Sequence, residues 1–521
     1  MDYQYYDEES DYIDVDDGDE DVEDDPSDFT YDDSLREEDY YGGGYEEDGI
    51  QLPDGYLEIL RSCAQPSLLQ VIQYVAPMLV VCLGCRLLCS LHGGRRKIQP
   101  GEAASAGSSS IPLHLIHLAS GLMILYVTLS HRLALILLLS VVGYVLLQLA
   151  RLGRRGAVIL AFVTIGSQFI YELLIWRQRN DWSQLRGIQM VVNMKVISLG
   201  FDLTATGTAK SKTIRVPNPL VYLGYIYSPA TSCLGPWISF ASYLDSLVPR
   251  NSWLVTLRRL LPNLVLCLVA LVVSNCIAPF LGELFASSSH FLGMYFEAMS
   301  VRSSHYFVSF IAQALLVASD QGTENESQWL GPLVTQPWRI EWPRSISSLV
   351  RSWNIPMHEW LKRYVYGPWK KEDGSKGRTI LAVLCTYLVS SLLHGMDLRI
   401  YLVLISLAIF GEGEVLLRRH ISSVLDACLS ANRCRGRDRC RYANCPKKRN
   451  WLCFRSCLIR LANLGFTALT IFHLAYLGVV LLGESLESSD DHESFLAHWQ
   501  RAGYLSHYIG VGTFVLYLFI S

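Results

Sequence analysis

The sequence lacks the short motifs that identify many soluble enzymes. It contains no G-x-S-x-G nucleophile elbow, no P-loop, no H-E-x-x-H pair and no G-x-G-x-x-G turn. It also shows no internal repeat, and its apolar runs contain few carboxylates. The motifs therefore give no support to an α/β-hydrolase, a P-loop NTPase, a zinc protease or a dinucleotide-binding enzyme. Nothing in the sequence predicts a nucleic-acid partner.

Basic residues are nearly absent from the N-terminal segment. Residues 1–50 contain 23 of the 49 acidic residues and one basic residue, Arg36. Such a chain cannot bury enough apolar surface to offset its entropy, so we expect 1–60 to be an acidic disordered tail. Its eight tyrosines could be modified or could bind a partner. The alternative is that the tail is solvated and has no function. No basic region precedes an apolar one here, so we expect the first span to act as a signal-anchor.

Long apolar runs dominate the rest of the chain. Apolar residues make up 50% of the sequence, and the mean hydropathy is +0.23. Runs of about 18 to 25 apolar residues can cross a hydrocarbon core of roughly 30 Å. The fifth run is the weakest because it contains Asn193 and Lys195. The predicted spans are 67–91, 111–130, 133–150, 156–176, 188–203, 260–283, 303–319, 379–395, 399–417, 459–483 and 503–521.

The basic clusters predict the orientation of these spans. Placing them in the cytosol puts the N-terminal tail and the acidic loop 483–495 on the far side, and the C-terminus in the cytosol. Only Arg177 and Arg179 fall on the wrong face. The clusters are Arg95–Lys97, Arg151–Arg155, Lys210–Arg215, Arg250–Arg259, Lys362–Arg378 and Arg433–Arg460.

Fourteen cysteines do not predict a disulfide scaffold. Eight are scattered, most of them within spans, where we expect them to serve as small apolar residues. Six crowd into the basic segment 428–457 with gaps of 5, 5, 4, 7 and 3 residues and no C-x-x-C pair. That spacing is a weak zinc signal, and we predict no metal site. We expect a Cys-rich cytosolic loop with reduced thiols, some of which are open to palmitoylation.

One histidine stands at the end of an apolar span. Ionisable groups in such positions are costly and mark candidate functional sites, although a lone histidine also caps helices or sits at the headgroup level. His394 shares one helix face with Tyr387, Ser390 and Ser391, which precede it by seven, four and three residues. This polar stripe must face a cavity or other helices. It fits either a reaction site or hydrogen bonds between helices.

A second candidate region lies upstream, in the Trp-rich basic segment 337–371. Tryptophans among basic residues are typical of a segment at the membrane interface. "PMHEWLKRYV" predicts an amphipathic helix lying on the membrane, with its proline in the first turn. Asn354 stands just before that helix, where a capping residue is the simplest interpretation. Cys385 lies nine residues before His394 and therefore points to another side of the helix. It is a poor nucleophile for this base, so a direct transfer fits the residues better than a covalent enzyme intermediate.

"SWNIPMHEWLKRYV", followed by "SSLLHG", resembles the paired motif of the membrane-bound O-acyltransferase (MBOAT) family. Four flanking stretches resemble the branch that attaches a monounsaturated fatty acid to a serine of Wnt proteins. These stretches are "RGIQMVVNMKVISLGFDL", "YLGYIYSPATSCLGPWISFASY", "PWRIEWPRS" and "LTIFHLAYLG". The resemblance covers about 60–521 and leaves out the acidic tail.

The resemblance implies an all-α polytopic core over 61–521, with about eleven transmembrane helices plus interfacial and re-entrant helices around a catalytic tunnel. It implies His394 as the catalytic base and Asn354 as its partner, with Trp353, Tyr387 and Ser390–Ser391 near the substrate. It also implies palmitoleoyl-CoA as co-substrate without a further cofactor, Wnt proteins as acceptors, and the endoplasmic reticulum membrane as location. "PATSCLGP" (229–236) is the expected re-entrant piece.

Three other interpretations stay open at this point. A transporter would also carry polar stripes, although it would usually show broken helices in matched halves. A scaffold that only binds a lipidated partner would keep the same motifs as structure. A sterol or diacylglycerol acyltransferase would share the Asn/His pair, but the flanking stretches and the acidic loop favour a protein acceptor.

Overall fold

The computed structural model describes residues 60–93, 111–175, 179–207, 216–322, 325–370, 376–434, 440–448, 453–482 and 496–521. The chain divides into two compact units, Met1–Asp54 and Gly55–Ser521, and every described residue belongs to the second. Apart from Leu60, the predicted acidic tail lies outside the described residues. So do the basic clusters Arg95–Lys97 and Lys210–Arg215, Arg177, and the whole acidic loop 483–495.

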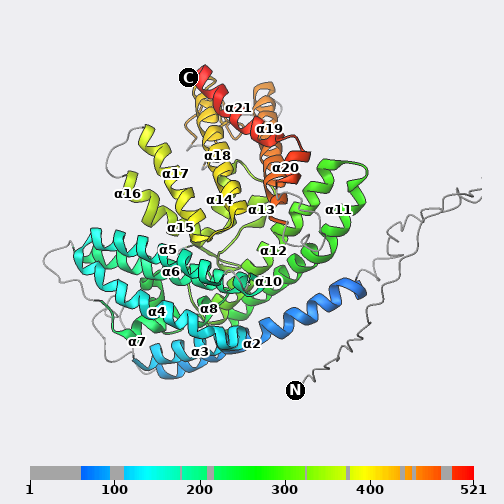
Figure 1. Cartoon of the computed structure of the whole chain (residues 1–521). Helices are drawn as coiled ribbons and strands as arrows, with labels where there is room; N and C mark the ends of the chain where they lie inside the picture. The colour runs from blue at the N-terminus through cyan, green and yellow to red at the C-terminus, as the bar shows by residue number, and fades with distance from the viewer. Residues whose placement is uncertain are drawn as a thin grey trace, which may run out of the picture. The chain divides into compact units, whose positions relative to one another are not determined.

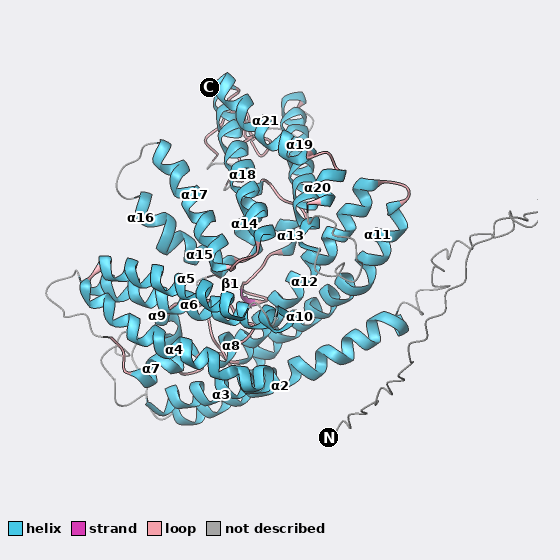
Figure 2. Cartoon of the chain, viewed as in Figure 1, coloured by secondary structure: helices cyan, strands magenta, loops and turns pink. Residues whose placement is uncertain are grey.

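The described part of the chain is almost entirely helical, with one very short antiparallel hairpin (Figures 1 and 2). The long helices are α2 (Gln65–Gly93), α3 (Ile111–Leu129), α4 (Leu133–Leu147), α5 (Arg154–Ile175), α6 (Arg179–Gly207), α10 (Trp253–Val272), α12 (His290–Ala318), α17 (Lys376–Leu393), α18 (Leu398–Val424), α19 (Phe454–Gly478) and α21 (Leu505–Ile520). The short ones are α7 (Pro219–Ile226), α8 (Pro229–Ser232), α9 (Phe240–Asp245), α11 (Ala278–Ala286), α13 (Pro337–Ile340), α14 (Ile346–Trp353), α15 (Ile355–Leu361), α16 (Gly367–Lys370) and α20 (Ala497–Arg501). The hairpin pairs β1 (Glu326–Ser327) with β2 (Gly331–Pro332).

Each of the eleven predicted spans coincides with a long helix, so the predicted all-helical polytopic fold class is confirmed. Six helical stretches are long and apolar enough to cross a membrane, and Ile380–Leu393 and Leu505–Ile520 are shorter apolar helices. The number of crossings stays a prediction. The six stretches are Arg61–Gly93, Ile111–Leu129, Leu133–Leu152, Trp253–Ala286, Leu398–Val424 and Phe454–Leu481.

Helix α12 is the central element of the fold. It packs against α2, α10, α11 and α19, and its last thirteen residues, from Tyr306 to Ala318, are mostly buried by protein. By contrast, α4 and α10 leave large apolar side chains such as Val145 and Val265 exposed. A soluble protein rarely exposes so many apolar side chains together, and lipid is the environment that suits them.

The two polar residues that weakened the span 188–203 both have protein partners. Lys195 is fully buried, and its Nζ donates to the carbonyls of Tyr225 and Ile226 and to Thr231 Oγ1, at 2.8 to 3.0 Å. These bonds satisfy the ammonium group and the free carbonyls at the end of α7. They also tie α6 to the predicted re-entrant piece 229–236, which includes α8 and is largely buried by protein.

Two cysteines that we expected to be small apolar residues are joined instead. Cys63, in the π-helical turn before α2, forms a disulfide with Cys276, in the π-helical turn after α10. The expectation for these two was wrong because the fold brings together positions 213 residues apart. The predicted orientation places this end of both helices on the side away from the cytosol, where disulfides persist.

We expect this disulfide to be detectable in the mature protein. After alkylation of the free thiols, reduction should release two further thiols, and non-reducing peptide mapping should recover Cys63 linked to Cys276. In Cys63→Ser, Cys276 should become reactive before reduction. The control is Cys457→Ser, which lies outside the bridge and should leave the linked peptide intact. A Cys276 that alkylates fully in the unreduced wild type would contradict the expectation.

Candidate active site

His394 directly follows the last residue of α17 and is only partly buried. Its backbone N–H donates to the carbonyls of Ser390 and Ser391, which closes the helix end. Within the described chain, no hydrogen-bond partner is found for its imidazole ring. His394 is therefore positioned through its backbone, and both nitrogens of its ring are available to a ligand.

The chain on both sides of His394 is held by α5. Gln168 donates from Nε2 to the carbonyl of Leu393 at 3.1 Å, and the backbone N–H of Met396 donates to Glu172 Oε2 at 2.9 Å. Both α5 side chains are buried. Because buried hydrogen bonds are costly to break, these contacts fix the position of the segment that carries His394.

Helix α6 supports this arrangement from the other side. Asn193 donates to Gln168 Oε1 at 2.8 Å, and Arg186 forms an ion pair with Glu172 at 2.9 Å. Arg186 also lies 3.7 Å from Asp397, whose Oδ1 accepts from the backbone N–H of Arg399 at the start of α18. Asn193, the other polar residue of the weak span, thus has a structural reason to be there.

Gly395 makes the turn after His394 possible. Its φ is +81°, a value that favours glycine, and a Cβ at this position would lie 2.6 Å from Glu172 Oε2. A side chain would have to adopt the left-handed conformation, at a cost of about 1–2 kcal/mol, and push against a carboxylate that holds the turn. Gly395 thus permits both the turn and the close approach of Glu172.

We therefore expect Gly395→Ala to lower acyl transfer at least tenfold by displacing His394, with donor binding little changed. The measurement is kcat and KM for transfer, together with the thermal midpoint of the purified protein. Gly465→Ala on α19 is the matched control, because a Cβ there meets no atom within 4 Å. Equal kcat values in both variants would show that the position of His394 does not depend on this turn.

Asn354 separates α14 from α15 and caps the second helix. Its Oδ1 accepts from the backbone N–H of Met357 at 3.1 Å, with Pro356 in the first turn. The capping role considered from the sequence is therefore confirmed. Among the described residues, no acceptor is found for its Nδ2, and the side chain is partly exposed. The same amide can cap the helix with its oxygen and donate to a ligand from its nitrogen.

Two sets of contacts connect the Asn354 region with the end of α17. Met357 and Trp360 of α15 belong to the same hydrophobic cluster as Leu393, the residue before His394. His305 of α12 stacks on Trp353 with ring centroids 4.6 Å apart, and its Nε2 bonds to the Trp353 carbonyl at 2.8 Å. The two motifs thus belong to one packed region.

The remaining predicted site residues differ in their surroundings. Tyr387 is partly buried and lies within electrostatic range of Arg351 and Glu412. Ser391 donates its hydroxyl to the carbonyl of Tyr387 one turn earlier, at 3.0 Å, so that hydroxyl is engaged within its own helix. Ser390 is 7% exposed, which leaves little surface for a substrate contact.

The amphipathic helix is present, but the prediction that it lies on the membrane was wrong about its apolar face. Met357, Trp360, Leu361 and Tyr364 are all buried in a cluster with residues of α6 and α17. Trp360 also donates from Nε1 to the Met194 carbonyl at 3.0 Å. Burial against neighbouring helices satisfies the same apolar stripe that a lipid surface would. The pattern itself cannot distinguish the two environments.

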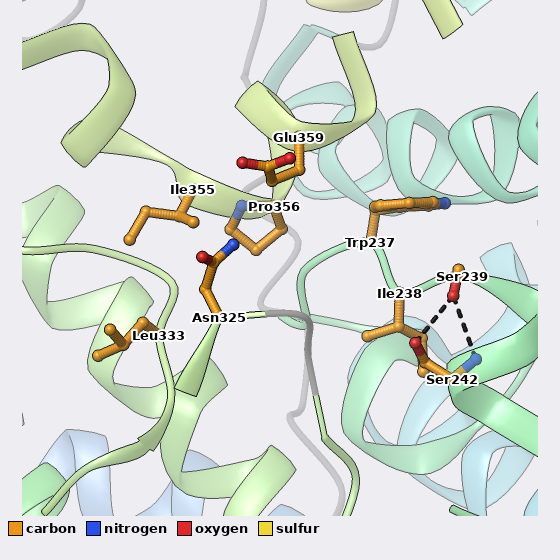
Figure 3. A pocket seen from close by; sticks show the side chains of 9 residues that line it. All are labelled: Trp237, Ile238, Ser239, Ser242, Asn325, Leu333, Ile355, Pro356 and Glu359. Atoms are coloured by element: carbon orange, nitrogen blue, oxygen red, sulfur yellow. Dashed lines mark hydrogen bonds between the residues drawn. The ribbon is translucent and has the colours of Figure 1, made fainter. Parts of the chain in front are cut away.

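A pocket opens beside α15, immediately after Asn354. Ile355, Pro356 and Glu359 of α15 lie along one side of it, facing Asn325 and Leu333 on the hairpin side (Figure 3). Trp237 and the serine pair Ser239–Ser242 complete its wall. None of the six predicted site residues lines this pocket, so it is distinct from the centre around His394, although Ile355 and Pro356 directly follow Asn354.

Sequence reasoning missed the residues that position the predicted pair. Glu172, Gln168 and His305 all fall within predicted apolar spans. Ionisable residues inside such spans are candidates for function, so Glu172 and His305 carried a detectable signal. Their partners were not detectable, because Glu172 bonds to a residue 224 positions away.

The fold and this site define a multi-pass membrane protein in which the helix that Asn354 caps packs close to the helix end that carries His394. The chain belongs to the membrane-bound O-acyltransferase family, whose family model matches residues 123–454. It is therefore an acyltransferase, and the resemblance inferred from the sequence motifs is confirmed.

Three relatives illustrate the range of the family. The chain is 63% identical to the protein-serine O-palmitoleoyltransferase porcupine of Drosophila melanogaster, over all of both chains. It is 31% identical to the human protein of that name, over 89% of this chain and 98% of the relative. A lysophospholipid acyltransferase of Schizosaccharomyces pombe is 22% identical over 50% of this chain and 58% of its own length.

Proposed function

We propose that this protein transfers palmitoleate from palmitoleoyl-CoA to a serine of Wnt proteins in the membrane of the endoplasmic reticulum. The observation that carries the proposal is the imidazole of His394, which has no hydrogen-bond partner among the described residues. Gln168 and Glu172 bond to the backbone of Leu393 and Met396 on either side of it, and Leu393 packs in one cluster with the helix that Asn354 caps. Support also comes from the similarity to two protein-serine O-palmitoleoyltransferases named porcupine, one of which matches over the whole chain.

The proposed reaction is a direct transfer. His394 accepts the proton of the serine hydroxyl as the serine oxygen attacks the thioester carbonyl carbon. A carbon–oxygen bond forms, the carbon–sulfur bond breaks, and the imidazolium returns the proton to the departing CoA thiolate. No further cofactor is needed, because the thioester itself supplies the activated acyl group.

Asn354 has a defined part in this proposal. Its oxygen is held by the Met357 N–H, which fixes the amide plane and leaves Nδ2 free to donate to the oxyanion. One such donor is typically worth about 10²–10³ in rate. Trp353, held by stacking on His305, and Tyr387 on the His394 helix are the proposed walls near the acyl chain.

The experiment that tests the function is acyl transfer by the purified full-length chain in liposomes. The donor is palmitoleoyl-CoA, and the acceptor is a disulfide-bonded Wnt hairpin peptide with a single serine. We expect an acyl group on the serine that resists neutral hydroxylamine, as an oxygen ester does, and no product from the Ser→Ala peptide. Normal donor binding without transfer would favour a scaffold that only holds a lipidated partner.

A lipid acceptor is the second candidate, because the chain is also similar to a lysophospholipid acyltransferase. The same reaction with lysophosphatidylcholine in place of the peptide separates the two functions. We expect transfer to the peptide to exceed transfer to the lysolipid at least a hundredfold. The opposite ratio would replace the protein acceptor with a lipid.

A further inference from the structure

Four cysteines of the basic loop gather around one point, although their sequence spacing gave only a weak zinc signal. The sulfur atoms of Cys428, Cys434, Cys440 and Cys445 all lie within 4.8 Å of one another. Those of Cys434 and Cys445 are 3.8 Å apart. Cys428, Cys440 and Cys445 are buried, with 6%, 7% and 1% of their surface exposed.

This spacing matches a tetrahedral thiolate site better than it matches disulfides. A zinc–sulfur bond of about 2.3 Å places the four sulfurs of a tetrahedron roughly 3.8 Å apart. A disulfide needs two sulfurs at about 2.05 Å and would join them in pairs. All four are free thiols in a structure that does form the Cys63–Cys276 disulfide.

Among the described residues, the thiols themselves make up most of the small apolar cluster of this loop. The only other described side chain in this small apolar cluster is Tyr442, so apolar burial alone offers little to hold the loop together. Small segments of this kind generally depend on a disulfide or a metal ion for their fold. Because thiols in the predicted cytosolic loop stay reduced, a disulfide is excluded there and a metal ion is left to stabilise the loop.

Basic residues around the cluster suit a tetrathiolate centre. Zn²⁺ with four thiolates has a net charge of about −2, and residues 428–448 contain seven basic residues and one acidic residue. Lys448 Nζ donates to the carbonyls of Cys440 and Tyr442, at 2.9 and 3.2 Å. Contacts of this kind hold ligand-bearing backbone in place in metal sites.

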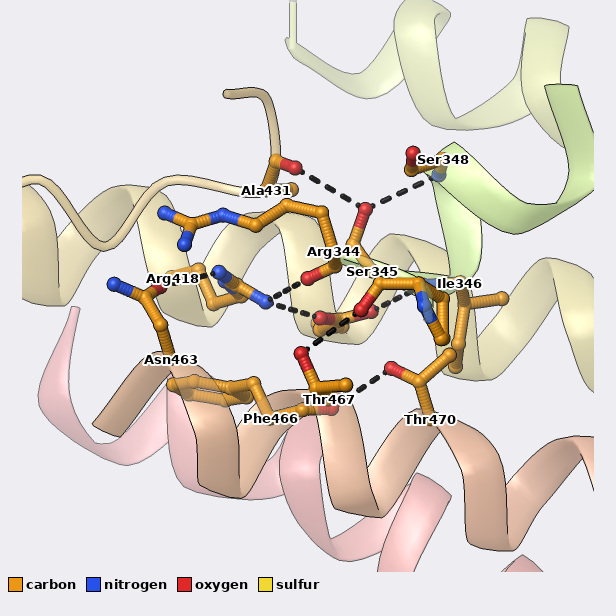
Figure 4. A network of polar contacts seen from close by, with 12 residues as sticks. Arg344, Ser345, Ile346, Ser348, Arg418, Ala431, Asn463, Phe466, Thr467 and Thr470 are labelled. Carbon is orange, nitrogen blue, oxygen red and sulfur yellow. Dashed lines mark hydrogen bonds and ion pairs between the residues drawn. The ribbon is translucent and has the colours of Figure 1, made fainter. Parts of the chain in front are cut away.

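We propose that Cys428, Cys434, Cys440 and Cys445 bind one structural Zn²⁺ ion as four thiolates. The site fastens the loop to the helix that leads to Asn354. Arg344 Nη2 and Asn463 Nδ2 donate to the Cys428 carbonyl, each at 3.1 Å. Ser345, which caps α14, donates its hydroxyl to the Ala431 carbonyl at 3.2 Å (Figure 4).

A network beneath these contacts connects the loop to α18. Arg418 is fully buried and donates to the Arg344 carbonyl and to Asn463 (Figure 4). It also donates to Glu414 and to the carbonyl of Leu429. Glu414 in turn accepts from the backbone N–H of Ile346, the first residue of α14. A loop held in place by zinc would keep its carbonyls within hydrogen-bond distance of Arg344 and Arg418 and would thereby stabilise this network.

The test measures the metal in the full-length protein, purified through a tag without histidines. Plasma mass spectrometry should find about one zinc per chain in wild type and at least a fivefold lower ratio in Cys445→Ser. Cys457→Ser, outside the cluster, should keep the wild-type ratio. Iron in place of zinc would overturn the assignment, as would equal zinc in wild type and Cys445→Ser.

A second measurement covers the case in which Cys445→Ser fails to fold. Titration of wild-type protein with an organomercurial should release one zinc, read with a colorimetric indicator, as four thiols react. The proposal would be overturned if wild type contained no metal. Cysteines that react with maleimide would then be plain thiols, and cysteines that carry hydroxylamine-sensitive acyl groups would be palmitoylated.

Discussion

Replacing His394 with alanine should lower kcat for acyl transfer by about 10²–10⁴-fold, the usual contribution of a positioned general base. The donor should still bind within a few-fold of wild type. The imidazole has no hydrogen-bond partner among the described residues, and the turn that carries it is held by backbone contacts to Gln168 and Glu172. Removal of the ring should therefore leave the surrounding structure in place.

The measurement is single-turnover transfer to the serine peptide, with palmitoleoyl-CoA binding measured separately on the same preparation. His290→Ala is the matched control, because His290 is an exposed residue at the start of α12. It should transfer at the wild-type rate. Loss of donor binding in His394→Ala in proportion to the lost transfer would instead assign His394 a structural role.

The second large effect concerns Asn354, where two roles can be separated by two substitutions. Asn354→Ala removes both the cap and the amide donor. It should cost about 1 kcal/mol of stability, as the loss of a helix cap usually does, and reduce transfer about 10²–10³-fold. Asn354→Asp keeps an oxygen that can accept from the Met357 N–H, so its stability should stay near that of wild type.

Asn354→Asp should nevertheless lose transfer as strongly as Asn354→Ala. The carboxylate has no N–H to donate, and its charge opposes the oxyanion. The measurements are thermal midpoints and kcat for wild type and both variants in the same detergent. Transfer restored in Asn354→Asp would mean that the cap alone explains the motif, and the proposed donor role would be withdrawn.

Much of the fold could be predicted because its signals are local. The length and hydropathy of each apolar run located all eleven long helices, since a run of that length is stable across lipid only as a helix. The acidic segment 1–50 lies outside the described residues, and the arrangement of the helices does not distinguish the two sides of a membrane, so the disordered tail and the orientation both stay predictions. The prediction from the Trp-rich stretch was correct about the apolar stripe of α15. It was wrong about what covers this stripe, which packs against α6 and α17 and not against lipid.

The candidate pair was also accessible from the sequence: the cost of a polar group at the end of a span pointed to His394, and the resemblance of two motifs to the family's paired motif added Asn354. The supporting residues were less accessible, because each depends on a contact between distant segments. Glu172 acts through the backbone of Met396, and His305 acts through Trp353. Helical periodicity says which face a side chain is on, but not which helix that face meets.

By itself, the sequence determined the class of this protein, a helical membrane acyltransferase, and the identity of its candidate catalytic pair. Only the tertiary structure decided which residues hold that pair, that Cys63 joins Cys276, and that four irregularly spaced thiols converge. The physical reason is the range of the interactions. Hydropathy and helix periodicity act over one or two turns, whereas a sulfur cluster, a disulfide or a buried clamp exists only after distant helices have packed.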